Sequence, residues 1–318
     1  MKILVTGGAG FIGSHIVDKL LIIGHEVLAV DNLSTGKQEN LETARQNFST
    51  SKFNFKNLDI CDQQHLLEEV KSFRPEIVLH LAAQTDVRKS VQDPVFDAQV
   101  NIIGTLSVLE ACRLSGVKKI IFPSSGGTIY GDKEKDAPGF SEKDFQCPLS
   151  PYGIAKKVIN DYLVSYEALY GLDFSILALS NVYGPRQDPF GEAGVVSIFA
   201  SRLLNGQTCT IYGQGDQSRD FIYVQDVADA FIAAIDKGSG LLINIGSGKS
   251  ISLNELYFAM AKIAKVDFDP LYEKPRPGEL QHSLLKIDLA KKELDWQPCV
   301  PLDKGLSLVL EWIANLTK

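Results

Sequence analysis

The stretch "KILVTGGAGFIGSHIV", residues 2–17, joins an apolar run to a helical pattern through a glycine-rich turn. Gly7, Gly10 and Gly13 are spaced GxxGxxG, and the pattern predicts a helix that begins near Ser14. Glycine lets the chain turn sharply and lets a pyrophosphate approach backbone amides at the positive end of a helix. Because tight turns also need glycine, the stretch by itself predicts only a strand–turn–helix unit.

Beyond this unit, short apolar runs alternate with longer segments of helical periodicity. The runs are "KILVTG" (2–7), "EVLAVD" (26–31), "FNFKNLDI" (53–60), "EIVLHLAA" (76–83) and "KKIIFPSS" (118–125). Such alternation indicates a parallel sheet with helices on both faces. The expected fold class is therefore α/β, a Rossmann-type doubly wound parallel sheet with a smaller mixed lobe.

Asp31 ends the second apolar run, 18 residues after Gly13. A carboxylate there would accept hydrogen bonds from both ribose hydroxyls of an adenosine. It would repel a 2'-phosphate, and no Arg or Lys occupies positions 32–36 to receive one. The unit therefore favours NAD over NADP, against the alternative of a solvent-facing turn aspartate.

The alternation weakens after "FSILALSNVYGPRQ", residues 174–187, where loops rich in Gly, Pro and Asp take over. One more helix and strand, within about 219–246, are expected to return to the first sheet. We expect helices of a smaller lobe near 252–265 and 303–316. The predicted division is an NAD-binding domain of residues 1–180 with 219–246, and a substrate-binding lobe of residues 181–218 and 247–318.

Composition limits the partners of this 318-residue chain. Its formal net charge of -7 argues against a non-specific nucleic-acid or anionic-membrane surface. The five cysteines are an odd number with no CxxC pair, so we expect reduced, mostly buried thiols in a cytoplasmic protein, and no metal site. No run approaches 18 uninterrupted apolar residues, and no cleavage site follows the N-terminal glycines, so neither a membrane span nor a signal peptide is expected.

The stretch "LSPYGIAKK", residues 149–157, places Tyr152 and Lys156 four positions apart after a Ser-Pro pair that opens a helix. Positions i and i+4 share one face of a helix, so the lysine can lie close to the tyrosine. Taken alone, the spacing also fits a half-buried aromatic with an unrelated lysine.

Nine motifs occur in one order along nearly the whole chain: "TGGAGFIG", "DNLSTG", "HLAAQ", "VNIIGT", "SSGGTIYG", "SPYGIAKK", "SNVYGPRQ", "RDFIYVQDVADA" and "RPGE". In these motifs the chain resembles the extended short-chain dehydrogenases/reductases, specifically the UDP-galactose (UDP-glucose) 4-epimerase family. The resemblance implies NAD-dependent 4-epimerisation of a UDP-hexose through a 4-keto sugar, with the cofactor tightly held. It also implies a UDP-sugar substrate and a two-fold homodimer made by helices near 95–115 and 151–170, although the sheet itself could cover those helices.

The resemblance also implies cofactor contacts. They are Gly7, Gly10, Phe11, Ile12, Gly13, Asp31, Asn32, Ser34, Thr35, Gly36, Asp59, Ile60, Leu81, Ala82, Ala83, Gln84, Asn101, Ser124, Tyr152, Lys156 and Ser180. Tyr152 would act as the base that takes a proton from the sugar. Bringing a phenol from a pKa near 10 to about 7 needs roughly 4 kcal/mol, and one charge about 4 Å away at an effective dielectric near 20 supplies that much.

One catalytic group departs from the family. A gapless match places Gly126 where the family usually supplies a serine or threonine hydroxyl, so Ser125, Thr128 or a water would take that role. Sugar-nucleotide 4,6-dehydratases carry an Asp-Glu pair where this chain has Gly126 and Gly127, and decarboxylating relatives usually carry glutamate at Thr128. The missing acids count against a dehydratase, a decarboxylase or a reductase, and the presence of both Tyr152 and Lys156 counts against a non-catalytic NAD-binding regulator.

In the smaller lobe, Arg219 and Arg276 are expected to hold the diphosphate of the substrate. The alternative is that they form surface ion pairs with Asp220 and Glu279. By resemblance, the other substrate contacts would be Gly126, Asn181, Val195, Tyr212, Glu279 and Ser283. Ser283 would border the C2 substituent of the hexose and leave room for an N-acetyl group, unless His282 or Leu284 fills that space.

Overall fold

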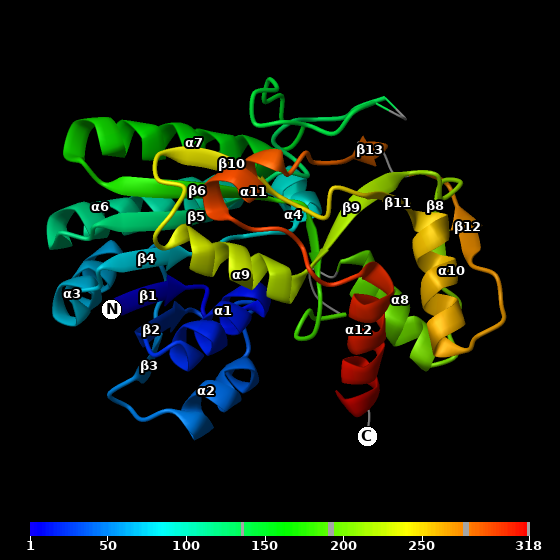
Figure 1. Ribbon diagram of the computed structural model, residues 1–318, viewed down its shortest axis with the longest axis horizontal. Helices are drawn as coiled ribbons and strands as arrows, with labels where there is room; N and C mark the ends of the chain where they lie inside the picture. The colour runs from blue at the N-terminus through cyan, green and yellow to red at the C-terminus, as the bar shows by residue number, and fades with distance from the viewer. Residues whose placement is uncertain (135–136, 190–193, 276–279, 317–318) are drawn as a thin grey trace.

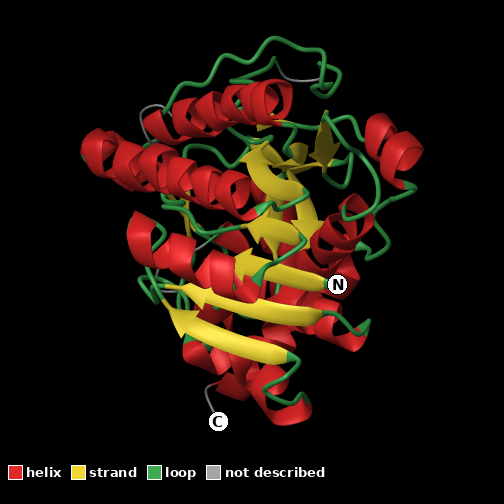
Figure 2. Ribbon diagram, turned by 90° about the vertical axis from the view of Figure 1, so that its left-hand side faces the viewer, coloured by secondary structure: helices red, strands yellow, loops and turns green. Residues whose placement is uncertain are grey.

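A computed structural model describes residues 1–134, 137–189, 194–275 and 280–316. Its largest element is a seven-stranded sheet in the order β10-β6-β5-β4-β1-β2-β3, in which every pairing is parallel (Figures 1 and 2). The strands are β1 (Lys2–Thr6), β2 (Glu26–Asp31), β3 (Phe53–Asn57), β4 (Ile77–His80), β5 (Lys119–Ser125), β6 (Asp173–Leu179) and β10 (Leu241–Ile245). The order reverses between β1 and β4, which confirms the predicted doubly wound fold.

Helices cover both faces of this sheet. In β1, Ile3 and Val5 pack into one apolar cluster and Leu4 into another, since successive side chains of a strand point to opposite faces. The first cluster includes side chains of α1 (Phe11–Ile22), α9 (Val224–Ala234) and α11 (Asp288–Leu294). The second includes side chains of α3 (Gln63–Phe73), α6 (Thr105–Ser115) and α7 (Pro151–Tyr170).

The glycine turn after β1 is tighter than its spacing alone indicated. Helix α1 begins at Phe11, three residues before the expected start, because Gly10 already serves as the N-cap. Gly7 has a φ of +69°, and a Cβ there would lie 2.6 Å from the backbone nitrogen of Ala82. A Cβ at Gly13 would lie 2.0 Å from the carbonyl oxygen of Gly7, so only glycine fits either position.

The smaller lobe lies beside the carboxyl edge of the large sheet (Figure 1). Its strand β9 (Ser218–Tyr223) pairs with β7 (Asn181–Tyr183), β11 (Ser250–Ser252) and β13 (His282–Ser283). Its helices are α8 (Val195–Leu204), α10 (Leu253–Ala264) and α12 (Leu302–Leu316), which share one apolar core. A two-stranded sheet of β8 (Thr210–Tyr212) and β12 (Leu271–Glu273) completes the lobe.

The chain returns to the large sheet where the sequence indicated. After β9, helix α9 packs against α1 and β10 pairs with β6. Residues 219–246 thus contribute to both sheets: β9 belongs to the sheet of the smaller lobe and β10 to the large sheet. The exact division into two domains stays a prediction.

Shorter elements connect these layers. They are η1 (Gln38–Leu41), α2 (Glu42–Asn47), α4 (Val87–Gln92), α5 (Pro94–Ala98) and the π-helix η2 (Gln99–Gly104). The continuous helical stretch Pro94–Ser115 is long and apolar enough to cross a membrane, but half of its most apolar part is buried inside the protein. A core helix meets the same criterion, and here the stretch packs against α3 and α7.

The cysteine prediction was right about pairing and wrong about burial. All five thiols are free, but only Cys112 and Cys209 are buried, while Cys147 and Cys299 are exposed. The exposed pair lie outside helices and strands, where apolar spacing gives no indication of burial.

Candidate active site

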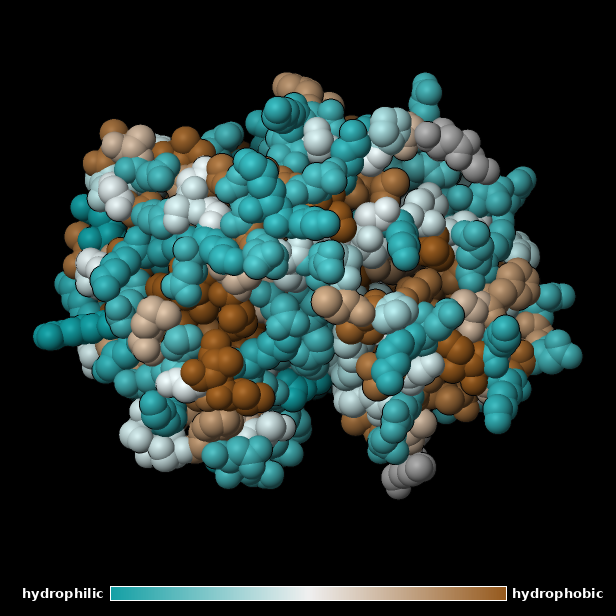
Figure 3. Space-filling view, in the orientation of Figure 1, coloured by the Kyte–Doolittle hydropathy of each residue, from teal (hydrophilic) through white to brown (hydrophobic). Residues whose placement is uncertain are grey.

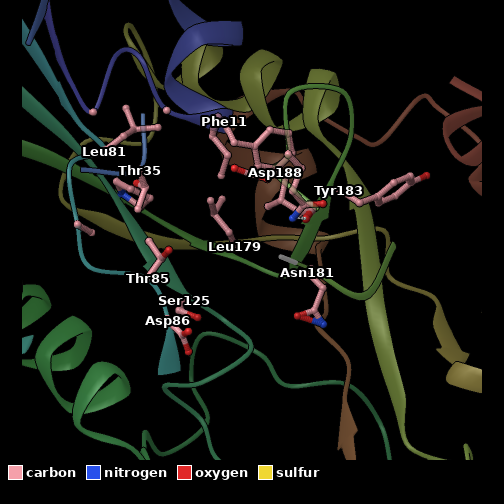
Figure 4. Close-up of a pocket in the computed structure, with 18 of the residues that line it drawn as sticks. Phe11, Thr35, Leu81, Thr85, Asp86, Ser125, Leu179, Asn181, Tyr183 and Asp188 are labelled. Carbon is pink, nitrogen blue, oxygen red and sulfur yellow. Dashed lines mark hydrogen bonds between the residues drawn. The ribbon is translucent and has the colours of Figure 1, made fainter. Parts of the chain in front are cut away.

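A cavity of about 1070 Å³ lies at the carboxyl edge of the parallel sheet, between the two lobes. Its walls come from the glycine turn, the ends of β2, β4 and β5, the start of α7, and parts of α8, β8 and β9. Figure 3 shows the notch in the molecular outline where the lobes meet, and Figure 4 shows side chains from both lobes around the cavity. A ligand here would touch both lobes at once.

Most of the predicted cofactor residues line this cavity. They are Gly7, Gly10, Phe11, Ile12, Gly13, Asp31, Asn32, Ser34, Thr35, Gly36, Asp59, Ile60, Leu81, Ala82, Ala83, Ser124, Tyr152, Lys156 and Ser180. Parallel strands end at the same edge of the sheet, so residues far apart in sequence meet here.

Asp31 is buried rather than solvent-facing, at 7% exposure, which excludes the turn-aspartate alternative. Its Oδ2 accepts a hydrogen bond from the backbone nitrogen of Ala9 at 3.0 Å, and its Oδ1 accepts one from that of Leu33 at 2.8 Å. Burial raises the pKa of Asp31, while these backbone donors partly offset the rise. A Cβ at Gly36 would lie 2.7 Å from Oδ1, so the glycine leaves this carboxylate accessible.

Asn32 and Asp59 lie together at the same end of the cavity. The Asn32 side chain donates from Nδ2 to Oδ2 of Asp59 at 2.9 Å. Burial would raise the pKa of Asp59, but hydrogen bonds from the Cys61 backbone and from Asn32 outweigh it and lower the pKa. The carboxylate is therefore held ionised on the cavity wall beside Ile60, another predicted cofactor contact.

Gln84 and Asn101, two further predicted cofactor contacts, do not line the cavity. Both are buried, and their side-chain amides donate to Oδ1 of the buried Asp97 at 2.8 and 3.0 Å. The Asn101 amide also exchanges hydrogen bonds with the backbone of Gln84. These residues form a buried polar network behind the cavity wall, a role that residue type alone did not indicate.

Tyr152 and Lys156 both line the cavity from the first two turns of α7. The helix begins as the Ser-Pro pair predicted, with Oγ of Ser150 accepting from the backbone nitrogen of Gly153 at 3.2 Å. Nζ of Lys156 lies 5.7 Å from the ring centroid of Tyr152 and donates to the carbonyl oxygen of Pro123 at 2.9 Å. Burial lowers the pKa of Lys156 to about 7, and the nearby carboxylate of Asp97 opposes this.

Two buried hydroxyls on the cavity wall suit a bound dinucleotide. Oγ of Ser124 and Oγ of Ser180 find no hydrogen-bond partner among the described residues, yet both residues line the cavity. A buried hydroxyl without a partner is costly, so these atoms fit polar groups of a ligand. Together with Gly7 and Asp31, the residues present fit NAD.

The structure distinguishes the two candidate catalytic hydroxyls. Ser125 lines the cavity, whereas Thr128 does not, and its Oγ1 lies 3.5 Å from the carbonyl oxygen of Ser125 in the turn after β5. A Cβ at Gly126 would lie 2.6 Å from Cδ1 of Leu285, so the backbone there points toward packed core. Gly126 does not line the cavity either.

Four predicted substrate residues line the far part of the cavity: Asn181, Val195, Tyr212 and Arg219. Figure 4 shows Asn181 on the side of the smaller lobe. The Arg219 guanidinium donates to the carbonyl oxygens of Ser218, Leu280 and Gln281, which hold it in place.

Asp220, the proposed alternative ion-pair partner of Arg219, instead accepts hydrogen bonds from Ser247 and is buried at 1% exposure. The remaining predicted substrate residues are Ser283, Arg276 and Glu279. Ser283 is buried in β13 and is not part of the cavity wall. Arg276 and Glu279 lie outside the described residues.

Sequence reasoning missed several polar residues of the wall. They are Lys37, Asn40, Thr85, Asp86, Arg88, Arg186, Gln187, Asp188, Arg202 and Gln217. Two carried a usable signal, since Arg186 and Gln187 stand in "SNVYGPRQ". The others come from loops and from the helices η1, α4 and α8, and no local pattern indicates that these segments reach the cavity.

The fold and cavity define a dinucleotide-binding α/β protein with a tyrosine–lysine pair at the ligand site. The family model described as "NAD dependent epimerase/dehydratase family" matches residues 3–246. The chain belongs to that family, whose members are NAD-dependent enzymes.

Individual relatives match over the whole length. A UDP-glucose 4-epimerase of Mycolicibacterium smegmatis is 45% identical over 316 residues, covering 99% of each chain. A solved UDP-glucose 4-epimerase of Thermotoga maritima, with UDP-glucose, has a TM-score of 0.95 at 45% identity and covers 100% of each chain. The Thermus thermophilus UDP-glucose 4-epimerase in complex with NAD has a TM-score of 0.90 at 41% identity, covering 99% of each chain.

Proposed function

We propose that this chain is an NAD-dependent UDP-hexose 4-epimerase that interconverts UDP-glucose and UDP-galactose. The observation that carries the proposal is the meeting of Tyr152, Lys156 and Ser125 on one cavity wall, beside residues that fit a dinucleotide. The relatives named above are similar over their full length, which supports the same reaction and the same substrate class.

The residues then divide the work. The Tyr152 phenolate oxygen takes the proton of the sugar 4-hydroxyl and later returns it, acting as general base and then, as the neutral phenol, as general acid. Lys156, when protonated, stabilises the phenolate through its charge, and the Ser125 hydroxyl orients the reacting oxygen. NAD, when bound, would supply a reversible hydride acceptor for C4 of the sugar. Asp31, Ser124 and Ser180 hold the cofactor, and Arg219 neutralises the substrate diphosphate.

Other reactions of the family need acids at positions where this chain has none. Elimination and decarboxylation would use carboxylates at positions 126–128, where this chain has Gly126, Gly127 and Thr128. At position 126 a side chain would also meet Leu285. Epimerisation needs no acid there, because one tyrosine serves both directions of proton transfer.

The direct test is to incubate purified protein with UDP-galactose and no added NAD, and to separate the products by chromatography. The expected product is UDP-glucose, and an incubation that starts from UDP-glucose should reach the same equilibrium mixture of the two sugars. Parallel incubations with UDP-glucuronate and dTDP-glucose test the rival reactions, and loss of CO₂ or water from either would contradict the proposal. No reaction with any of them would favour a non-catalytic NAD-binding protein.

The acetylated substrates are proposed only from the alignment of Ser283. Because Ser283 is buried away from the described cavity wall, any effect on the sugar C2 pocket would pass through its neighbours. Comparing specificity constants for UDP-N-acetylglucosamine and UDP-glucose in wild type and Ser283→Tyr tests this. An unchanged ratio would exclude Ser283 as the gate.

We also propose a cytoplasmic homodimer that forms through the helices near 95–115 and 151–170, which pack against each other. These helices carry exposed apolar side chains, among them Val95, Ile103, Ile154, Val164 and Leu169. Apolar side chains left exposed on packed helices are typical of an interface. Sedimentation analysis of wild type and of Val95→Glu would test it, with a shift toward monomer expected in the variant.

A further inference from the structure

One loop crosses from the smaller lobe to the glycine-turn helix along the cavity wall. Residues 184–188, here called the strap, follow β7, whose Val182 and Tyr183 pack in the core of the smaller lobe. Arg186, Gln187 and Asp188 of the strap all line the cavity. The strap therefore borders the cavity in which a dinucleotide would lie.

Two partly buried contacts fasten the strap to α1. Nε2 of His15 lies 2.9 Å from the carbonyl oxygen of Pro185. Nη2 of Arg186 donates to Oδ2 of Asp18 at 2.7 Å, and both side chains of this ion pair are less than 20% exposed. Arg186 has a φ of +70°, a backbone conformation that non-glycine residues seldom adopt, so these contacts hold the strap in a defined path.

A third contact joins the end of the strap to the loop that follows β2. Nζ of Lys37 lies 2.8 Å from Oδ2 of Asp188, and the two side chains are 53% and 32% exposed. The backbone nitrogen of Lys37 donates to the carbonyl oxygen of Ala9 at 3.0 Å, so the lysine is anchored to the glycine turn. Both Lys37 and Asp188 line the cavity, which places this ion pair on its wall (Figure 4 labels Asp188).

We propose that the Lys37–Asp188 ion pair is a clasp that slows the departure of NAD from the cavity, an inference that rests on the proposed cofactor site. The ion pair bridges two loops that both face the ligand site. In this proposal, NAD leaves the cavity only when the two loops separate. The two inner contacts keep the strap in register, while the exposed pair is the one that water and salt can open. Charged groups at this degree of exposure contribute little to folding, so the effect falls on ligand release.

The expected effect is modest and measurable. An ion pair of this exposure corresponds to about a two- to fivefold change in a rate. Asp188→Asn and Lys37→Gln should each release bound dinucleotide about two- to fivefold faster than wild type, and the double variant no faster than either single one. The charge reversal Lys37→Asp with Asp188→Lys should bring the rate back toward wild type. These groups keep the cofactor in place and do not touch the reacting atoms, so the readout is release.

The experiment follows NADH release from the purified full-length chain. Protein loaded with NADH is mixed with excess NAD, and the decay of NADH fluorescence gives the rate. At about 1 M salt the Debye length is near 3 Å, so the difference between wild type and the single variants should disappear. Urea unfolding of every variant checks that folding is intact.

The chain offers a matched control. Nζ of Lys56 and Oε1 of Glu69 form another ion pair at 2.8 Å, with side chains 50% and 29% exposed, between β3 and α3 and away from the cavity. Lys56→Gln should leave the release rate at the wild-type value. Wild-type rates in both Lys37→Gln and Asp188→Asn, additive effects in the double variant, or equal acceleration by Lys56→Gln would each overturn the clasp. Failure of wild type to hold NADH at all would overturn the proposed cofactor site, and the clasp with it.

Discussion

The substitution Gly126→Ser would restore the hydroxyl that the family usually has at this position. The structure predicts that this substitution destabilises the folded chain. A Cβ on Gly126 would lie 2.6 Å from Cδ1 of Leu285 and 3.1 Å from the carbonyl oxygen of Ala178. Carbon atoms in contact are about 3.5 to 4.0 Å apart, so Leu285 would have to move by about 1 Å. Leu285 is only 1% exposed and cannot turn into solvent.

Overpacking of this kind costs about 1 to 3 kcal/mol. We therefore expect Gly126→Ser to lower the free energy of unfolding by that amount, measured by urea titration followed by circular dichroism. In a Leu285→Ala background the same substitution should cost less than about 0.5 kcal/mol, because the space it needs is then free. The difference between these two costs measures the steric clash with Leu285 separately from any general effect of serine at this position.

The neighbouring glycine is the control. A Cβ at Gly127 meets its nearest atom, Oδ1 of Asn181, at 3.7 Å, which is an ordinary contact. Gly127→Ser should therefore change the free energy of unfolding by less than about 0.5 kcal/mol. The reasoning would be refuted if Gly126→Ser were as stable as wild type, or if its cost were the same with and without Leu285.

Three further predictions concern catalysis and pH. Tyr152→Phe should keep its fold and bound NAD but lower turnover at least about a hundredfold, and wild-type turnover would exclude the mechanism. Ser125→Ala should lower kcat by about tenfold to a thousandfold while Thr128→Ala stays near wild type; the opposite ranking would reassign the hydroxyl. Because burial lowers the pKa of Lys156 to about 7 against about 10.4 when unfolded, the folded protein loses this proton first, so the contribution of Lys156 to the free energy of unfolding should rise with pH between these values. In urea titrations from pH 7 to 10, the slope of stability against pH should be more positive in wild type than in Lys156→Met, and equal slopes would contradict the shift.

Local patterns predicted the first half of the molecule well. The apolar runs and the glycine turn gave the strands β1 to β5 within a few residues, because each run is short and bounded by turn residues. β1, β2, β4 and β5 are buried along nearly their whole length, whereas β3 is the half-exposed edge strand. The start of α1 was placed three residues too late, since Gly10 itself caps the helix. The Ser-Pro start of α7 was predicted correctly because capping depends only on adjacent residues.

Contacts between distant segments were predicted less well. Gln84 and Asn101 bear the right groups for a ligand, but the structure turns their amides toward Asp97. Neither Asp97 nor the packing of Leu285 against Gly126 has a local signal, because each depends on which elements meet in space.

The sequence by itself determined the class of fold, the glycine turn, Asp31 and the Tyr152–Lys156 pair, since each follows from the order and spacing of neighbouring residues. Only the tertiary structure decided which hydroxyl faces the cavity, which amides lie behind its wall, and how Lys37 meets Asp188. These depend on how packed segments meet in space, and some of them, such as Lys37 and Asp188, are more than a hundred residues apart, so sequence spacing carries no information about their distance.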